Sequence, residues 1–385
     1  MTATAFVYGP HLQAHNPSAD TERRMRRELG IALLEAYGLL DHPELTRHDP
    51  RSATEAEILA VHTPEYVDAV KRIGADSSLA ADPDERRWGF ADGDTIAHPG
   101  MHEVAAAVCG SAVTGALEIW EGRADQAFCP APAGLHHAIA DRASGMCVYN
   151  DAAVAIQALL DRGAERIAYI DVDAHHGNGV QWIFYEDPRV LTCSVHESGR
   201  YLYPGSGHLG ERGVGEAEGT SVNVPLPPYA GDASYLGAVD RVIGPAVQRF
   251  APEVVVMMTG VDPHHTDPMA HLQVTTACFP RLHGKLRNIA RDAAGGRWLI
   301  VTGGGYNIDL LPRLWAVQLA TMLDVELPET LPGEWLAMAG ERAERDFTPD
   351  LLGDVPFQVD EALRARADSE AFETIEAARG LFGLG

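Results

Sequence analysis

Three polar residues that could bind a metal alternate along one short stretch of the chain. Asp171, Asp173 and His175 are spaced by two, so on an extended backbone their side chains point the same way. Two of them could then reach one metal ion while Asp171 stands behind them. The alternative is that this run is a loop of capping and turn residues.

Asp262 follows a different apolar run and is the candidate third ligand. Carboxylate oxygen and imidazole nitrogen suit a borderline cation such as zinc. Three protein ligands that leave a position open are typical of a catalytic zinc site and not of a structural one. The pattern therefore predicts a zinc site formed by Asp173, His175 and Asp262.

Two further segments contain groups that could act on a metal-activated water. The tandem pair His136 and His137 offers a general base and an electrostatic partner, although adjacent histidines on a loop are often only solvated. The glycine run 303–305 lets the backbone approach closely, and Tyr306 after it would enter the same cleft. A phenol there can donate a hydrogen bond to a developing oxyanion.

These polar segments follow short apolar runs that are typical of buried strands, and amphipathic stretches lie between the runs. The alternation predicts βα units and a parallel sheet covered by helices on both faces. Ligands bind outside the carboxyl ends of the strands in such sheets, which is where the polar segments stand. The clearest expected strands are 166–171, 190–195, 253–259 and 297–302, and the clearest expected helices are 151–161 and 234–250.

Bulk composition narrows the class of protein. The chain has 385 residues, 46% of them hydrophobic, which allows a sizeable core. No signal-peptide pattern and no membrane-spanning apolar run is present, so we expect neither export nor a membrane partner. The formal net charge of −25 argues against a nucleic-acid partner. Five cysteines without a C-x-x-C pair suit buried thiols in a reducing cytoplasm.

Taken together, the polar segments resemble the zinc-dependent histone deacetylase family, which includes bacterial acetoin-utilization deacetylases and acetylpolyamine amidohydrolases. The resemblance runs from about Asp94 to Trp315. The phrases GDTIAHPGMHE and HESGRYLYPGSG favour the acetoin-utilization branch. The matching stretches are GLHHA, ASGMCVYND, YIDVDAHHGNGVQ, SVHESGRYLYPGSG, GVDPHHTDPMAHL and GGGYN.

The resemblance implies an arginase-deacetylase fold, which is a single α/β domain with a central parallel sheet of about eight strands flanked by helices. We expect the zinc deacetylase catalytic domain to occupy residues 1–325. Residues 326–385 contain 14 acidic and 5 basic residues. We expect this part to form an acidic, partly helical extension packed on the same domain.

The resemblance also implies a role for each polar side chain. It implies that one divalent ion per chain is bound by Asp173, His175 and Asp262. The implied ion is zinc, and Fe²⁺ is a further candidate in the cell. His137 is implied as the general base, with His136 beside it polarised by Asp171. Tyr306 is implied to stabilise the tetrahedral intermediate.

Further positions match the substrate channel and a second ion. Asp94 matches the rim carboxylate that holds the backbone amide of the substrate. The narrow acyl-lysine channel would be lined by Gly145, Met146, Tyr203 and Met269. A potassium ion beside the zinc is also implied, bound partly through Asp171, Asp173, His175, Ser194 and Val195.

One position departs from part of the family. Many nuclear-type members have an aspartate behind the base histidine, whereas this chain has Asn178, as does another branch of active deacetylases. His137 then lacks a full negative charge that would raise its pKa, while His136 retains one in Asp171. We therefore expect a neutral His137 as the base and a more readily charged His136.

The resemblance implies a hydrolase: a metal-dependent amidohydrolase that acts on linear amide C–N bonds and deacetylates acetyl-lysine side chains of proteins. Small acetylated amines such as polyamines stay open as substrates, because 81–94 is rich in Asp and Glu, although Met269 stands where some polyamine enzymes have an acidic residue. A catalytically inactive sensor of acylated ligands is disfavoured, because competent residues fill the catalytic positions. An arginase-type two-metal site is disfavoured because it needs aspartates where Gly177 and His264 stand.

Overall fold

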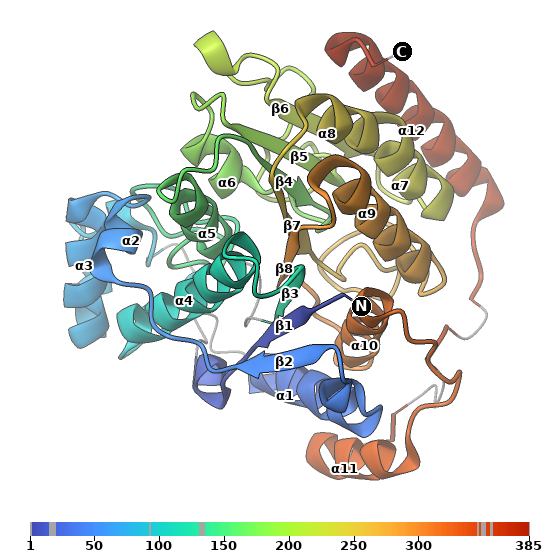
Figure 1. The fold of residues 1–385 in the computed structure, drawn as a ribbon, viewed down its shortest axis with the longest axis horizontal. Coiled ribbons are helices and arrows are strands. Elements are labelled where there is room, and N and C mark those ends of the chain that lie inside the picture. The colour runs from blue at the N-terminus through green and yellow to red at the C-terminus, as the bar shows by residue number, and fades with distance from the viewer. Residues whose placement is uncertain are drawn as a thin grey trace.

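Eight parallel strands form the central sheet of this chain in a computed structural model (Figure 1), in the order β2-β1-β3-β8-β7-β4-β5-β6. The structure describes residues 2–14, 21–91, 94–130, 135–344, 346–347, 352–354 and 357–384, so Gly134 of the GLHHA stretch lies outside the described residues. The predicted α/β class is confirmed, and the sheet agrees with an arginase-deacetylase fold. The strands are β1 (Thr4–Val7), β2 (Leu45–His48), β3 (Gln126–Cys129), β4 (Ile167–Asp171), β5 (Val190–Glu197), β6 (Ser221–Leu226), β7 (Val254–Thr259) and β8 (Trp298–Thr302).

The four strands expected from the apolar runs are all present as β4, β5, β7 and β8. Three of them begin one residue later than predicted. β5 continues two residues beyond the predicted end, because His196 and Glu197 still pair with Pro225 and Leu226 of β6. The end of a strand thus depends on pairing with a partner strand, which the local sequence of that strand does not reveal.

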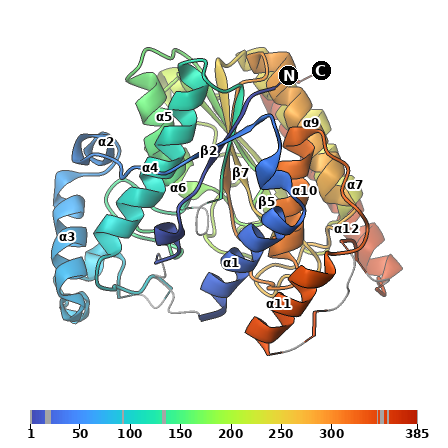
Figure 2. The same cartoon turned by 60° about the horizontal axis from the view of Figure 1, so that its bottom comes forward.

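Helices cover both faces of the sheet, as Figures 1 and 2 show. Helices α2 to α6 lie on one side, and α1, α7 to α10 and α12 lie on the other. The helices are α1 (Thr21–Ala36), α2 (Glu55–Leu59), α3 (Pro64–Ala75), α4 (Met101–Trp120), α5 (Asp151–Leu160), α6 (Asn178–Ile183), α7 (Asp232–Ala238), α8 (Gly244–Phe250), α9 (Cys278–Ala294), α10 (Leu311–Leu323), α11 (Gly333–Ala343) and α12 (Glu361–Phe382).

The helix expected over 151–161 is α5, but the one expected over 234–250 is not a regular α-helix. A π-helical turn, Val239–Ile243, separates α7 from α8. Pro245 follows this turn at the start of α8 and has no N–H to donate. The regular hydrogen-bond ladder is interrupted there, which is the physical reason for the irregular turn.

Alternate strand residues divide the core into two layers. On β4, Ala168 and Ile170 pack in the layer that contains α7 to α10, whereas Ile167 and Tyr169 pack in the layer that contains α4 and α5. Both faces are apolar because helices cover both, as the continuous apolar runs predict. The five cysteines, all within the described ranges, are buried and free.

Helix α4 is long and apolar enough to cross a membrane by length and composition, and 78% of its most apolar window is buried in the protein. It packs against α5 and against strands β1 and β3. Such burial is what the central helix of a folded core requires, so its hydropathy alone does not argue for a membrane.

The C-terminal part of the chain contains α11 and α12, which lie on opposite parts of the molecule (Figure 1). Helix α11 packs against α1, where the indole N–H of Trp335 donates to the backbone oxygen of Leu29 at 3.0 Å. Helix α12 packs against β6 and α7, where the Ser234 hydroxyl donates to Asp368 at 2.6 Å. A domain boundary at residue 325 stays a prediction.

Candidate active site

The loops that follow β3, β4, β7 and β8 meet at the carboxyl end of the sheet. β7 lies between β4 and β8, so residues from distant parts of the chain become neighbours there. Asp173 and His175 follow β4, Asp262 follows β7 and Tyr306 follows β8. The loop after β3, the other neighbour of β8, carries the tandem histidines.

Asp173, His175 and Asp262 form a buried group whose ligand atoms lie within 4.8 Å of one another. The Nδ1 atom of His175 is 3.1 Å from Oδ1 of Asp173 and 3.0 Å from Oδ2 of Asp262. Backbone N–H groups hold the other oxygens, because Gly304 N donates to Asp173 Oδ2 at 2.6 Å and Ala174 N donates to Asp262 Oδ1 at 2.8 Å. Both carboxylates are therefore fixed in orientation.

The close approach of the β8 loop to this group requires a glycine at position 304. A Cβ atom there would lie 2.3 Å from Asp262 Oδ2 and 3.0 Å from Asp173 Oδ2. No side chain fits at such a distance without moving a carboxylate. The glycine run thus permits the close backbone approach that the sequence predicts.

The charge of the group fits a divalent cation. Asp173 and Asp262 are both 0% exposed, and uncompensated buried charge costs several kcal/mol, as a rough figure. Burial and the neighbouring Asp173 raise the pKa of Asp262 to about 8. Burial opposes protonation of His175, but the two carboxylates raise the pKa of this imidazole well above its usual value. A divalent cation would supply the compensating charge that protons otherwise supply.

His136 pairs with Asp171 at the back of the group. Its Nδ1 atom is 2.8 Å from Asp171 Oδ2, which also accepts the hydroxyl of Tyr169 at 2.5 Å. Burial by itself would lower the pKa of His136, but the charges of Asp171 and Asp173 raise it to about 9. The carboxylate therefore orients this imidazole and favours its protonated form.

His137 lies beside His136 in the opposite electrostatic environment. The two ring centroids are 4.0 Å apart, and Nδ1 of His137 is 2.7 Å from the side-chain oxygen of Asn178. Burial, followed by the charges of His136 and His175, lowers the pKa of His137 well below its usual value. The neutral ring donates from Nδ1 to the amide oxygen, so its Nε2 lone pair is available as a base.

A tight turn over 144–147 closes one side of the site. Gly145 and Met146 have φ angles of 54° and 65°, both in the left-handed region. A Cβ atom at position 145 would lie 2.4 Å from the His137 ring and 2.9 Å from the Tyr203 ring. Only glycine satisfies both the turn and the two aromatic neighbours.

Tyr203 forms a wall that reaches from His137 to the surface. The two rings meet edge to face, with centroids 5.0 Å apart. The phenol hydroxyl is hydrogen-bonded to the Ser144 hydroxyl, and 41% of the residue is exposed. Met269, on the loop after β7, is also exposed, and its backbone N–H donates to Asp267 at 2.9 Å.

Asp94 is exposed on the loop before α4. It accepts the hydroxyl of Thr95 at 3.0 Å, and Thr95 Oγ1 in turn accepts the N–H of Met146 at 2.9 Å. Burial and, to a smaller extent, the charge of Asp94 raise the pKa of Tyr203 to about 12. The structure therefore brings Asp94 close to the turn and wall predicted to line the channel.

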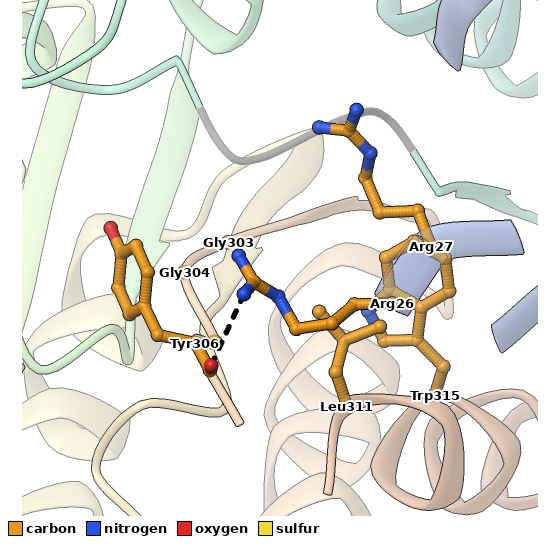
Figure 3. Close-up of a pocket in the computed structure, with 8 residues that line it drawn as sticks. Arg26, Arg27, Gly303, Gly304, Tyr306, Leu311 and Trp315 are labelled. Atoms are coloured by element: carbon orange, nitrogen blue, oxygen red, sulfur yellow. Dashed lines mark hydrogen bonds between the residues drawn. The ribbon is translucent and has the colours of Figure 1, made fainter. Parts of the chain in front are cut away.

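Tyr306 is held by its backbone on both sides. Its N–H donates to Asp267 Oδ2 at 2.7 Å, and its carbonyl oxygen accepts Nη1 of Arg26 at 3.2 Å. Figure 3 shows the phenol hydroxyl directed away from that guanidinium, and the ring centroid lies 6.4 Å from that of His175. A small pocket behind it is lined by Arg26, Arg27, Leu311, Trp315 and the backbone of 303–306 (Figure 3).

Two of the residues implied for potassium, Asp173 and His175, are also candidate zinc ligands, and the others lie on β4 and the adjacent strand β5. Asp171 is paired in register with Ser194 on the adjacent strand β5. The Ser194 hydroxyl is 2.8 Å from Nδ1 of His196, and the backbone oxygen of Val195 accepts the hydroxyl of Tyr235 at 3.3 Å. The structure gathers these residues in one place, and their role as potassium ligands stays a prediction.

Asp267 belongs to the matching stretch GVDPHHTDPMAHL, but no role is predicted for it from the sequence. Its buried carboxylate accepts the backbone N–H groups of both Tyr306 and Met269. Tyr169, which donates to Asp171, was also missed, because it lies inside an apolar strand. The sequence signal that could have indicated Asp267 is its position: it follows Asp262 closely and directly precedes a proline.

The two positions at which an arginase-type site would need aspartates, 177 and 264, make other contacts in this fold. The ring nitrogens of His264 lie 2.9 Å from Thr266 Oγ1 and 2.9 Å from Asp354 Oδ1. At Gly177, a Cβ atom would lie 2.1 Å from Asp171 Oδ2. These contacts argue against the two-metal alternative, as the residue types do.

Comparison with known proteins agrees with this geometry. The profile of the histone deacetylase domain matches residues 20–322. The chain belongs to the histone deacetylase family. The Acetoin utilization protein AcuC of Bacillus subtilis (strain 168) is 37% identical over 338 residues, covering 87% of this chain and 86% of the relative. The AcuC proteins of Staphylococcus aureus (strain MSSA476) and Staphylococcus xylosus are 36% and 34% identical over 336 residues, covering 86% of this chain in each case and 85% and 86% of the relatives.

The match to the histone deacetylase family begins well before Asp94, where the motifs first become recognisable. The N-terminal elements contribute packing and backbone contacts, such as that of Arg26 with Tyr306, and these leave little trace in the sequence. The predicted resemblance to the acetoin-utilization branch agrees with the names of these relatives. This member of the family has a buried Asp-His-Asp group compatible with the divalent metal site typical of the family.

Proposed function

We propose that this chain is a zinc-dependent deacetylase that hydrolyses the acetyl amide of lysine side chains in proteins, releasing acetate and a free amine. One observation carries the proposal. Two adjacent histidines have different partners, Asp171 behind His136 and Asn178 behind His137. Both histidines lie next to a buried group that fits a divalent cation. One histidine is thus set to hold a proton and the other to accept one.

The proposed chemistry divides the work among residues that the fold places together. A divalent cation on Asp173, His175 and Asp262 would supply Lewis-acid activation of the acetyl carbonyl and of water. His137 accepts the proton of the attacking water, for which its lowered pKa keeps it neutral. Tyr306 donates to the oxyanion that develops on the carbonyl oxygen.

The departing amine needs a proton as the C–N bond breaks. A protonated imidazole of the pair supplies it, and the carboxylate behind His136 keeps positive charge stable there. The oxygen of water is then bonded to the acetyl carbon in acetate, and the protons of water are distributed between acetate and the free amine. A positioned base contributes roughly 100 to 10,000-fold to such a reaction, and an oxyanion donor roughly 100 to 1,000-fold.

The walls of the site favour a long, slender acyl-amine over a bulky substrate. Gly145 and Tyr203 stand on the side of His137, and both are in van der Waals range of its ring or of each other. The exposed Met269 gives the rim no acidic group at its position, which favours acetyl-lysine over polyamines. Asp94 is exposed, so a protein substrate could reach its carboxylate with a backbone amide.

A direct test compares hydrolysis of a fluorogenic acetyl-lysine peptide, an acetylated polyamine and longer acyl-lysine peptides by zinc-loaded protein. We expect the acetyl-lysine peptide to give the highest kcat/KM, and His137→Ala to abolish most of it. A higher kcat/KM for the polyamine would mean that acetylated polyamines, and not protein acetyl-lysines, are the substrates. Tight binding of an acetylated ligand without turnover would instead indicate an inactive sensor.

The finer identity of the ions is part of the proposal. Zinc is proposed at the Asp-His-Asp group, with Fe²⁺ as the competing cation, and anaerobic reconstitution with each metal separates them. Potassium is proposed behind it, so replacing potassium by a large organic cation in the buffer should change activity while leaving zinc content unchanged. A cytoplasmic location is proposed because five free, buried thiols suit a reducing compartment.

A further inference from the structure

Asp354 lies in the C-terminal segment between α11 and α12, yet its carboxylate reaches a loop of the active site. Oδ1 lies 2.9 Å from Nε2 of His264 and accepts the hydroxyl of Thr276 at 2.7 Å. Oδ2 accepts the backbone N–H of Thr276 at 2.7 Å. The side chain is mostly buried, with 17% exposed. Such a carboxylate fixes the groups that donate to it.

The acceptor character of this carboxylate sets the direction of a longer chain of hydrogen bonds. A carboxylate can only accept, so Nε2 of His264 carries the proton, and Nδ1 of the neutral ring accepts. Nδ1 lies 2.9 Å from Oγ1 of Thr266 and 3.2 Å from the Thr266 backbone N–H, both of which can donate. Oγ1 of Thr266 then accepts the side-chain N–H of Asn307 at 2.8 Å.

Every member of this chain therefore donates toward Asp354, from Asn307 through Thr266 and His264. The direction is uniform, so the bonds polarise one another and act as a unit. Asn307 is the residue directly after Tyr306. The chain of bonds thus runs from the C-terminal part of the protein to the side chain of the residue that follows the proposed oxyanion donor.

The loop crossed by these bonds also carries two groups of the site itself. Asp262, a candidate metal ligand, begins it, and Asp267 within it accepts the N–H of Tyr306. The loop makes backbone bonds from Val274 N to Pro263 O at 3.2 Å and from His265 N to Val274 O at 2.9 Å. These bonds join 263–265 to Val274, and Asp354 links the same two stretches through its contacts with His264 and Thr276.

We propose that Asp354 is a positioning residue that acts through His264, Thr266 and Asn307 to hold Tyr306 where its phenol can meet the developing oxyanion. The proposal rests on the proposed deacetylase function. It gives the segment beyond residue 325 a role in the reaction and not only in covering the sheet. Misplacement of a catalytic group by about 1 Å can cost on the order of 100-fold in rate, so a distant anchor can matter.

A second metal site is the competing explanation, because ligand atoms of His264, His265 and Asp354 lie within 4.8 Å of one another. The contacts favour hydrogen bonding. Both oxygens of Asp354 already accept from Thr276, and Nε2 of His265 is 3.7 Å from the carboxylate. The metal alternative is therefore an outcome of the test.

The experiment compares Asp354→Asn with Asp360→Asn in the full-length, zinc-loaded protein. Asp360 lies in the same segment and caps α12 through a bond to Leu363 N, a role that asparagine can also fill. We expect Asp354→Asn to lower kcat about 10-fold with little change in KM or zinc content, and Asp360→Asn to match the wild type. Thr266→Val, which breaks the same chain without touching the C-terminal segment, should give the same split.

Two further readouts separate positioning from a general structural role. In a Tyr306→Phe background, Asp354→Asn should have little additional effect, because the two changes act through one group. Amide hydrogen exchange over 303–310 should be faster in Asp354→Asn than in Asp360→Asn, whether or not the substrate has been identified correctly. If the wild type is inactive as a deacetylase but Asp354→Asn still exchanges faster than Asp360→Asn, the deacetylase proposal has failed while the coupling exists. The positioning role would then have to be restated for another reaction.

Four results would overturn the inference. The first is an active wild type with equal kcat for Asp354→Asn and Asp360→Asn. The second is a full loss from Asp354→Asn that persists in the Tyr306→Phe background. Unchanged exchange over 303–310 is the third. The fourth is a second stoichiometric zinc ion in the wild type that Asp354→Asn alone removes, which would make the cluster a metal site.

Discussion

The Nδ1 atom of His137 lies 2.7 Å from the side-chain oxygen of Asn178. This imidazole therefore donates to a neutral amide, whereas its neighbour His136 faces the carboxylate of Asp171. The difference separates the two pKa values, since that of His137 is lowered by burial and nearby positive charge, while the carboxylates raise that of His136 to about 9. Two adjacent residues of one type are thus suited to different steps.

Asn178→Asp should move the acidic limb of the kcat/KM profile to higher pH. A base works only when neutral, so the rate falls as pH falls through the pKa of His137. A carboxylate beside the ring favours its protonated form and raises that pKa. The measurement is kcat/KM against pH at constant zinc content. Asn288→Asp, which adds the same charge on the exposed side of α9, is the control, and a limb that stays in place would exclude His137 as the titrating base.

His137→Ala should lower kcat by roughly 100 to 10,000-fold, because it removes the proton acceptor of the reaction. His136→Ala should have a smaller effect, since its position is to hold charge and not to accept the first proton. Ligand binding should change little in either variant. Steady-state kinetics with metal analysis checks this, and small, equal losses from both variants would contradict the division of roles.

Asp262→Ala should lose zinc affinity and with it activity, because one of three buried protein ligands is removed. Metal analysis after dialysis should give about one zinc per chain for the wild type and substoichiometric zinc for the variant. Asp292→Ala, an exposed aspartate on α9, should behave as the wild type. Full zinc occupancy in Asp262→Ala, or wild-type activity in a strong chelator, would show that the ligand set is wrong.

His283→Leu should stabilise the protein. His283 is fully buried on α9, and neither ring nitrogen has a hydrogen-bond partner among the residues that the structure describes. An unsatisfied buried polar group costs about 1 to 3 kcal/mol, so an apolar side chain of similar size should raise the free energy of unfolding by about 1 kcal/mol. Urea unfolding at pH 7 measures this, with the exposed His208→Leu as the control.

The gain from His283→Leu should increase on acidification. Burial lowers the pKa of His283 to about 3, whereas an unfolded histidine takes up its proton near pH 6.5, as an approximate reference value. The unfolded state therefore binds more protons as pH falls below that value, and the wild type loses stability that the variant keeps. A variant with an unchanged or lower urea midpoint would mean that the ring is hydrogen-bonded in solution.

Much of the site could be predicted from local sequence, because its candidate ligands and bases are polar residues that follow the apolar strands directly. The spacing of Asp173 and His175 by two follows from the geometry of an extended chain, and the glycine run allows the close approach seen at Gly304. No role was predicted for Asp267, because its contribution is to accept hydrogen bonds from the backbone N–H groups of Tyr306 and Met269. A hydrogen-bond acceptor has no pattern of its own in the sequence.

The sequence alone determined the strand-forming runs, the buried character of the sheet and the residue types of the candidate ligands, since these depend on neighbours close along the chain. Only the tertiary structure decided that β7 lies between β4 and β8, which brings Asp262 to Asp173. It also decided that Arg26 reaches the backbone of Tyr306 and that Asp354 reaches His264, although Arg26 and Asp354 lie near opposite ends of the chain. Strand order and helix docking are set by packing of whole apolar faces, and periodicity specifies which residues are buried but not which distant partners they meet.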